Sequence, residues 1–189
     1  FTPSKDANTN LINEGINPDS IKLTGNIMID SLVSNIEKAN GKILKKLNIK
    51  EKQYALVTLH RPSNVDKKDI LVDIVSALNR ISEKIPVVFP LHPRTKNKIK
   101  EFNIQHNNNA RIIFTEPLGY LDFLSLTKNA KLVLTDSGGI QEETTALGIP
   151  CLTLRENTER PITVKEGTNK IIGNTKSRII EEFNYVLSN

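Results

Sequence analysis

The chain has 189 residues, of which 38% are hydrophobic and 25% are charged, so we expect an ordinary globular protein rather than a disordered or fibrous one. A single cysteine, Cys151, excludes an internal disulfide. The formal net charge of +5 does not indicate a nucleic-acid partner, because the basic residues are spread along the chain and only 5% of residues are aromatic.

Targeting and metal signals are weak in this sequence. It shows no signal peptide and no apolar run long enough to cross a membrane, so we expect a cytoplasmic protein without a membrane partner. The first residue is Phe1 rather than Met, and we expect the chain to be a piece of a longer protein. His60, His92 and His106 are far apart, so we expect no metal and no cofactor, and His106 is expected to be a solvated loop residue. Cys151 lies in an apolar run, which predicts a buried structural thiol rather than a nucleophile.

The first fifty residues are predicted to be mostly helical. Ser4 is expected to cap a short helix that ends at Gly15, and residues 21–23 are expected to form a brief strand. Residues 24–26 break the pattern before an apolar helix, and a lysine-rich helical segment then runs to about Leu47.

From residue 54 onward, short apolar strands alternate with amphipathic helices. Loops are expected at 60–64 and 107–109. The predicted strands are 54–59, 86–91, 111–115, 132–135, 149–154 and 170–172. The predicted helices are one capped by Asp66, then 95–102, 120–128, one that ends at Gly148, and a C-terminal one through Ile179 and Leu187. This alternation predicts an α/β fold, a Rossmann-like parallel sheet with helices on both faces.

Polar residues directly follow several of these predicted strands. The residues are His60 and Arg61, His92 and Arg94, Asp136 to Gly139, and Arg155 to Arg160. Ligands of such sheets bind beyond the carboxyl ends of the strands, where these groups would converge. The sequence therefore predicts an anion-binding site at this edge, although Arg155 would serve equally as a salt-bridged strand-end residue.

The segment 132–143 is predicted to be a strand, a tight turn and a helix start. Gly138 and Gly139 would let a phosphate approach the backbone at the positive end of the helix, and Ser137 would add a hydroxyl. Carboxylates at Glu142 and Glu143 would repel a diphosphate unless they bind a neutral neighbour such as a ribose diol. The alternative interpretation is an ordinary helix cap with turn glycines and glutamates that suit the helix dipole.

Several motifs together resemble the non-hydrolysing UDP-N-acetylglucosamine 2-epimerases. They are Thr58-Leu59-His60-Arg61, Pro90-Leu91-His92-Pro93, Glu116-Pro117-Leu118, the run Thr135 to Glu143, and Thr158-Glu159-Arg160-Pro161, with weaker matches at Thr24-Gly25-Asn26 and Gly167-Thr168. The resemblance implies one half of a glycosyltransferase-B-type fold. Residues 1–26 would be a remnant of a preceding N-terminal domain with the interdomain crossing, and residues 27–189 the C-terminal UDP-binding domain.

The resemblance also implies roles for individual residues. Ser137, Gly138 and Gly139 would grip the diphosphate, and Glu143 would bind the ribose hydroxyls. Leu118, through its backbone, and Phe123, through its ring, would line the uracil site, while Arg160 would meet phosphate or sugar. His60 would act at the departing UDP, unless it is only a loop histidine bonded to the backbone. His92 would face the sugar, bind a second regulatory nucleotide sugar, or merely orient its loop.

The family reaction interconverts UDP-GlcNAc and UDP-ManNAc by elimination and re-addition of UDP. Its acid and base carboxylates belong to the N-terminal domain, so the resemblance implies a UDP-binding half that is inactive alone and needs that domain as a partner. A homodimer is also implied. The alternatives are a hydrolysing epimerase, a glycosyltransferase of the same architecture, and a noncatalytic nucleotide-sugar binding module. Ser63 and Ile162 stand where the family usually has acidic residues.

Overall fold

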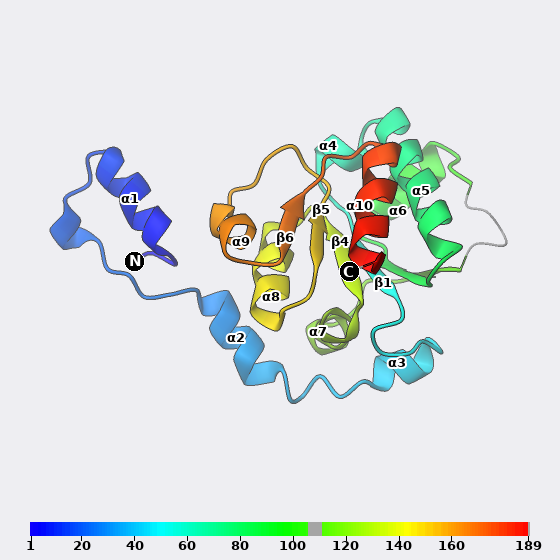
Figure 1. Cartoon of the computed structure of the whole chain (residues 1–189), viewed down its shortest axis with the longest axis horizontal. Coiled ribbons are helices and arrows are strands. Elements are labelled where there is room, and N and C mark those ends of the chain that lie inside the picture. The colour runs from blue at the N-terminus through cyan, green and yellow to red at the C-terminus, as the bar shows by residue number, and fades with distance from the viewer. Residues whose placement is uncertain (106–110, 189) are drawn as a thin grey trace.

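A computed structural model describes residues 1–105 and 111–188, and its body is an α/β layer structure (Figure 1). His106 and the predicted loop 107–109 lie outside the described residues. The six strands predicted from residue 54 onward are confirmed, with ends that shift by one or two residues. The strands are β1 (Ala55–Thr58), β2 (Val87–Pro90), β3 (Ile112–Thr115), β4 (Leu132–Thr135), β5 (Cys151–Thr153) and β6 (Asn169–Ile171).

The strands form one parallel sheet in the order β3-β2-β1-β4-β5-β6. From β1 the chain proceeds to one edge through β2 and β3, and from β4 it proceeds to the other edge. The order therefore reverses between β1 and β4, where Thr58 lies opposite Thr135. In a doubly wound sheet the crevice for a ligand opens at this reversal, beyond the carboxyl ends of the two strands.

Helices cover both faces of the sheet because successive strand side chains point to opposite sides. In β4, Leu132 and Leu134 pack on one side with helices α5 (Lys68–Ser82) and α10 (Lys176–Ser188). Val133 packs on the other side with helices α3 (Lys42–Lys46) and α7 (Tyr120–Asn129). The predicted Rossmann-like fold is thus confirmed.

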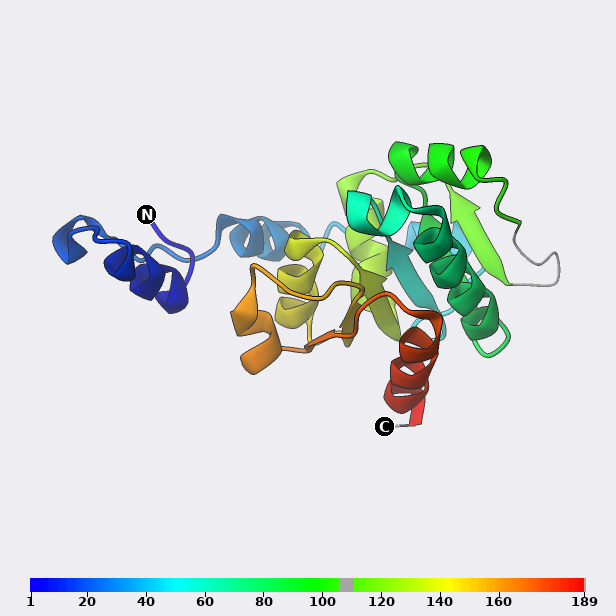
Figure 2. The same ribbon diagram turned by 90° about the horizontal axis from the view of Figure 1, so that it is seen from above.

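The N-terminal segment extends away from this body (Figures 1 and 2). It contains α1 (Lys5–Asn13), which buries none of its residues, and the short 3-10 helix η1 (Pro18–Ser20). The chain then reaches the body in α2 (Ile27–Asn35). The strand expected at 21–23 is wrong, because only a single bridge joins Leu23 to Thr2. Helix α2 lies beside α8 (Gly138–Leu147), which ends as predicted at Gly148, in a left-handed conformation with a φ of 67°.

Helix α5 does not begin at Asp66 as predicted. Its N-cap is Lys67, while Asp66 ends a four-residue helix, α4 (Pro62–Val65), that occupies part of the expected loop 60–64. Asp66 instead accepts hydrogen bonds from the guanidinium of Arg94, including one of 2.9 Å from Nε to Oδ1. Side-chain pairing across the sheet edge therefore overrides the local capping pattern.

Two further helices complete the architecture. Helix α6 (Pro93–Glu101) begins two residues earlier than predicted, with proline at its first position. Helix α9 (Pro161–Lys165) was not predicted and follows the polar run after β5. Within the described residues, no helix is long and apolar enough to cross a membrane.

Candidate functional site

Asp136 organises the carboxyl ends of β1 and β4. It lies directly after β4, is fully buried, and accepts hydrogen bonds from the backbone N–H groups of His60 at 3.1 Å and Arg61 at 2.9 Å. The side-chain amide of Asn64 donates to the same carboxylate at 3.1 Å and to the carbonyl of Leu154 at 2.8 Å. One carboxylate thus holds the turn after β1 against the turn after β4.

The electrostatics keep Asp136 ionised. Burial alone would raise the pKa of this carboxyl, but hydrogen bonds from His60, the Arg61 backbone and Asn64, together with the charge of His60, outweigh burial and lower it. A buried carboxylate is stable only when its oxygens are satisfied in this way. Asp136 is therefore a fixed negative charge behind His60.

His60 is oriented by a side chain. Its Nδ1 lies 3.1 Å from Oδ1 of Asp136, and its side chain is 37% exposed. An imidazole held at Nδ1 exchanges a proton with a ligand through Nε2. Of the two interpretations of His60, the arrangement favours a residue aimed at the site.

His92 stands close to His60 but is held differently. The two ring centroids are 5.6 Å apart, with planes tilted by 41°. His92 is the N-cap of α6, and its Nδ1 accepts a hydrogen bond of 3.2 Å from the backbone N–H of Arg94. Its ring therefore orients the loop before α6, and its Nε2 remains the nitrogen for a ligand.

The N-terminus of α8 lies beside this pair, after β4. Ser137 is the N-cap without a side-chain capping bond, so the ordinary-cap interpretation is not supported for its hydroxyl. Its backbone N–H donates to Oγ1 of Thr135 at 3.0 Å. The first amides of a helix have no carbonyl partner within it, and those of Gly138 and Gly139 start α8 here. This end of α8 has the polarity that favours an anion.

A carboxylate, that of Glu159, already lies against this helix end. An ideal Cβ built on Gly138 would lie 2.6 Å from Oε1 of Glu159, so any larger residue at 138 would displace that side chain. Glu159 also bridges two arginines, Arg61 at 2.9 Å and Arg155 at 2.5 Å. Arg155 therefore forms the salt bridge that was its alternative role. Because its partner Glu159 lies against the end of α8, the salt bridge also places Arg155 at the candidate site.

Glu143 is an unusual carboxylate one helical turn further along α8. Only 4% of the residue is exposed, and Oε2 is buried without a hydrogen-bond partner among the described residues. Burial, followed by the charge of Glu142, raises the pKa of Glu143. Gly139 and Glu143 are four residues apart and lie on the same helix face. The unsatisfied oxygen is suited to a hydroxyl donor from a ligand.

Leu118 lies two residues before α7 and Phe123 lies in its first turn, on the sheet face that α8 also covers. Both are half-buried and pack against the same apolar cluster, which contains Val133 and Ile140. Tyr120 lies between them in the sequence, and the charge of Glu143 contributes, after burial, to raising the pKa of its hydroxyl. An apolar surface for a flat ring thus adjoins the Glu143 carboxylate.

Arg160 is paired within the chain. Its Nε lies 3.0 Å from Oε1 of Glu142. The segment before it is tied to α8, because Oγ1 of Thr158 donates to Oε1 of Gln141 at 2.6 Å and accepts from the backbone N–H of Arg160 at 2.9 Å. Asn169 donates to the same Gln141 oxygen at 3.1 Å. These hydrogen bonds, one of them buried, fix the polar run after β5 over the helix.

Cys151 is a buried residue of β5. Cys151 is buried as predicted, and burial raises the pKa of its thiol to about 11 despite hydrogen bonds with Thr144 and Thr153. Within residues 1–105 and 111–188 no three His, Cys, Asp or Glu side chains are arranged to hold a metal ion.

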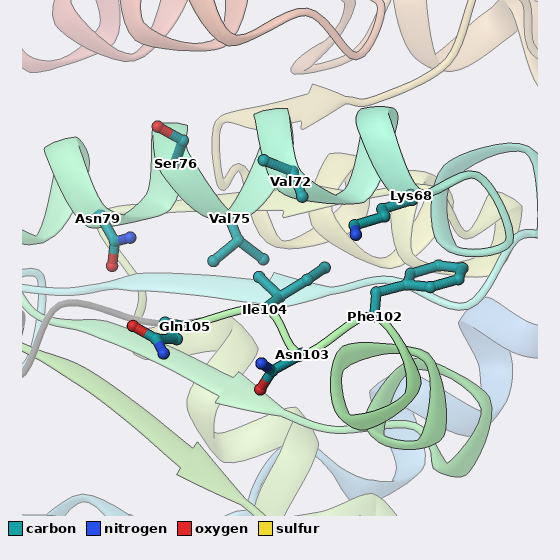
Figure 3. A pocket seen from close by; sticks show the side chains of 9 residues that line it. All are labelled: Lys68, Val72, Val75, Ser76, Asn79, Phe102, Asn103, Ile104 and Gln105. Carbon is teal, nitrogen blue, oxygen red and sulfur yellow. The ribbon is translucent and has the colours of Figure 1, made fainter.

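A hollow of about 500 Å³ lies elsewhere, between α5 and the segment after α6 (Figure 3). Its lining includes one ionisable side chain, Lys68, and no carboxylate, histidine or arginine. We therefore assign the functional site to the strand-end edge. The hollow is lined by Lys68, Val72, Val75, Ser76, Asn79, Phe102, Asn103, Ile104 and Gln105.

Several partners of the predicted site residues have no local signal in the sequence. The carboxylate contacts of Asp136, the amide bridge of Asn64 and the anion position of Glu159 were not foreseen. Each follows a strand, and that position was the available signal. His60 and Asn64 lie more than 70 residues from Asp136, and Arg61 lies 98 residues from Glu159, so no local pattern predicts these contacts. The Arg155–Glu159 pair spans only four residues.

Comparisons with known proteins show the family of the chain. Residues 1–189 match the family model described as UDP-N-acetylglucosamine 2-epimerase. The UDP-N-acetylglucosamine 2-epimerases of Methanococcus maripaludis and Methanocaldococcus jannaschii are 43% and 42% identical to the chain, over 95% and 100% of its length. The chain spans about half of these relatives, 51% and 54% respectively.

Solved structures show the same likeness. The crystal structure of the M. jannaschii UDP-GlcNAc 2-epimerase in complex with UDP-GlcNAc and UDP matches all of this chain with a TM-score of 0.91, over 54% of its own length. The ADP-heptose heptosyltransferase II of E. coli, with 16% identity and a TM-score of 0.58, shares the fold alone. The family model and the close relatives both extend over essentially the whole chain, and on that ground the chain belongs to the UDP-N-acetylglucosamine 2-epimerase family.

Proposed function

We propose that this chain is the UDP-binding half of a UDP-N-acetylglucosamine 2-epimerase, formed by residues 27–189 after a segment, 1–26, that joins it to another domain. Such an enzyme is an isomerase that interconverts UDP-GlcNAc and UDP-ManNAc. The chain spans about half of its relatives, and the M. jannaschii relative was solved with UDP-GlcNAc and UDP. We further propose a cytoplasmic homodimer, as the family resemblance implies.

The observation that carries the proposal is the pairing of a helix N-terminus with an unsatisfied carboxylate on the same helix. Gly138 and Glu143 are five residues apart, which corresponds to about 7.5 Å along α8. A diphosphate at the first position and a diol at the second are the two polar parts of a nucleoside diphosphate. Leu118 and Phe123 then offer the adjoining surface to the uracil ring.

The remaining residues take roles around the diphosphate and the sugar. Nε2 of His60, backed by the Asp136 carboxylate, would donate a proton or a hydrogen bond to the departing UDP. Arg160 would exchange Glu142 for phosphate or sugar oxygen. His92, 5.6 Å from His60 between ring centroids, would contact the sugar or a regulator. The acid and base at C2 would come from the other domain, so this half alone would not epimerise.

Calorimetric titration of the 189-residue chain with UDP tests the binding proposal. We expect binding by the wild type and loss of binding by a Ser137→Ala, Glu143→Ala double variant that melts at a similar temperature. A folded wild-type chain that does not bind UDP would contradict the proposal. A matched Glu181→Gln variant controls for removal of a carboxylate, because Glu181 is 66% exposed and lies on α10.

Product analysis tests the proposed reaction in the protein that carries both halves. UDP-GlcNAc should yield UDP-ManNAc with the nucleotide sugar intact, followed by proton NMR of the anomeric signals. Release of free N-acetylmannosamine and UDP would indicate a hydrolysing epimerase instead. Transfer of the sugar to an acceptor would indicate a glycosyltransferase.

A further inference from the structure

We propose that Glu159 is an internal anion that occupies the diphosphate position of the unliganded chain and is exchanged for the ligand. The inference rests on the proposed function, since it concerns the same end of α8. Oε1 of Glu159 would lie 2.6 Å from a Cβ built on Gly138, the first residue of the helix. The carboxylate therefore fills space that a phosphate needs if it is to reach the backbone there.

Two arginines hold Glu159 in this position. Nη2 of Arg61 lies 2.9 Å from Oε1, and Nη1 of Arg155 lies 2.5 Å from Oε2. Burial by itself would raise the pKa of the Glu159 carboxyl. A hydrogen bond to its own backbone and the charges of Arg155 and Arg61 outweigh burial and lower this pKa. It is thus a full negative charge at neutral pH. Guanidinium groups bind carboxylate and phosphate oxygens with the same geometry.

The surroundings allow the side chain to leave without a backbone change. Glu159 is flanked by Thr158, which hydrogen-bonds Gln141, and by Arg160, whose backbone N–H donates to Thr158. The Glu159 side chain itself is 41% exposed and has an open path to solvent. Rotation of its side-chain torsions would release both arginines and uncover Gly138 while the tethered segment stays in place.

The exchange makes a prediction about ligand charge. A diphosphate brings more negative charge than one carboxylate and can take over both arginines, whereas a neutral nucleoside cannot. Glu159 therefore lowers the affinity for UDP and leaves the affinity for uridine unchanged. It also favours release of UDP, because the carboxylate returns to the arginines as the diphosphate departs.

Titration of the full 189-residue chain and its Glu159→Gln variant with UDP tests the exchange. We expect UDP to bind about three- to tenfold more tightly to the variant, the range set by the loss of one or two partly exposed ion pairs. The matched Glu181→Gln variant, which also removes one negative charge, should bind UDP as the wild type does. Uridine affinity, measured by ligand-observed NMR, should be equal in all three proteins.

A double-mutant cycle with Arg61→Gln tests whether the arginine changes partners. In the wild type, Arg61→Gln removes a binding partner both from UDP and from the Glu159 carboxylate that competes with it. The loss of UDP affinity should therefore be small. In the Glu159→Gln background only UDP loses a partner, and the loss of UDP affinity caused by Arg61→Gln should be about threefold larger. The cycle separates exchange from simple repulsion, which would leave the cost of Arg61→Gln the same in both backgrounds.

The outcomes distinguish this inference from the proposed function. If the wild type binds UDP but Glu159→Gln binds equally or more weakly, the exchange is wrong and the UDP site stands. Additive substitutions in the cycle would also overturn the exchange. If neither folded protein binds UDP or inorganic pyrophosphate, both proposals fail.

Discussion

Replacement of Glu143 by glutamine should stabilise the unliganded chain while weakening its ligand binding. The carboxylate is 4% exposed and Oε2 has no hydrogen-bond partner among the described residues. A buried unsatisfied polar group costs about 1–3 kcal/mol, and charge adds to this cost. Since an amide desolvates more easily but is also left partly unpaired, we expect a net gain of about 1 kcal/mol. For a chain of this size that raises the melting temperature by about 2–4 °C.

The effect of pH on Glu143 has a definite sign. Its pKa is raised in the folded chain above the ordinary 4.5, so the folded state holds the proton more tightly than the unfolded state. The free energy of unfolding therefore falls as the pH rises from about 4.5 through the folded pKa. The Glu143→Gln variant should lack this decline, and its stability gain should vanish at the acidic end of the range. Thermal melts of the wild type and the variant, from pH 4 upward in steps of about half a pH unit, measure the decline and the stability gain.

The same substitution should cost UDP affinity. A hydrogen bond to a charged group contributes about 1.5–3 kcal/mol, and glutamine keeps one acceptor oxygen for two ribose hydroxyls. We expect UDP binding about 10- to 100-fold weaker by calorimetry. The 2′-deoxy analogue should bind the wild type more weakly than UDP does, and the variant should show a smaller difference between them.

Opposite results would refute this reasoning about Glu143. A variant that melts below the wild type at neutral pH would mean that the carboxylate is satisfied in the unliganded chain. Equal discrimination between UDP and its 2′-deoxy analogue in both proteins would mean that Glu143 does not bind the diol. The Glu181→Gln variant should change neither quantity, since Glu181 is a surface residue of α10.

Three further predictions concern the frame of the site. Asp136→Asn should lower the free energy of unfolding by about 3 kcal/mol, because donors such as Asn64 lose a buried charged acceptor. The folded pKa of Asp136 lies below 3.8, so the stability advantage of the wild type over this variant should disappear in thermal melts as the pH falls through that folded pKa. Gly167→Ala should cost about 1–3 kcal/mol by urea unfolding, because its Cβ would lie 2.5 Å from the backbone carbonyl of Thr163, whereas Gly119→Ala, with open space around it, should be nearly neutral. Cys151 should react with a thiol reagent at pH 8 only after unfolding by guanidinium, because the folded thiol is buried with a pKa of about 11; fast reaction of the folded chain would contradict this burial.

Strand β6 is Asn-Lys-Ile with Lys170 exposed, but the other strands were predictable because each is a short apolar run, as expected of strands covered on both faces. The buried runs in β1 and β4 show this directly. Helix boundaries were less predictable, as the error at Asp66 shows. A carboxylate before a helical pattern normally caps the helix, but Arg94 lies across the sheet edge and binds Asp66 instead. A partner 28 residues away is not part of the local pattern.

The candidate site was predictable as a set of strand-end residues, but not as a set of contacts. His60 and Asp136 are 76 residues apart and meet because β1 pairs with β4 at the reversal of strand order. Glu159 reaches Arg61 across 98 residues for the same topological reason. The sequence indicates which residues follow strands, whereas the strand order decides which of them become neighbours.

Two carboxylates beside a proposed diphosphate site need a physical explanation, and they have different ones. Glu143 lies one turn inside α8, where no cation of the described residues pairs with Oε2, so the free-energy cost of burying this oxygen would be relieved by neutral donors such as a diol. Glu159 lies at the helix end between Arg61 and Arg155, so its charge is compensated until a stronger anion takes those arginines. The first carboxylate would favour binding of the nucleoside, and the second would oppose binding of the diphosphate. In the proposed function, which releases UDP from the sugar and binds it again, this balance would keep either state of the site from becoming too stable to leave.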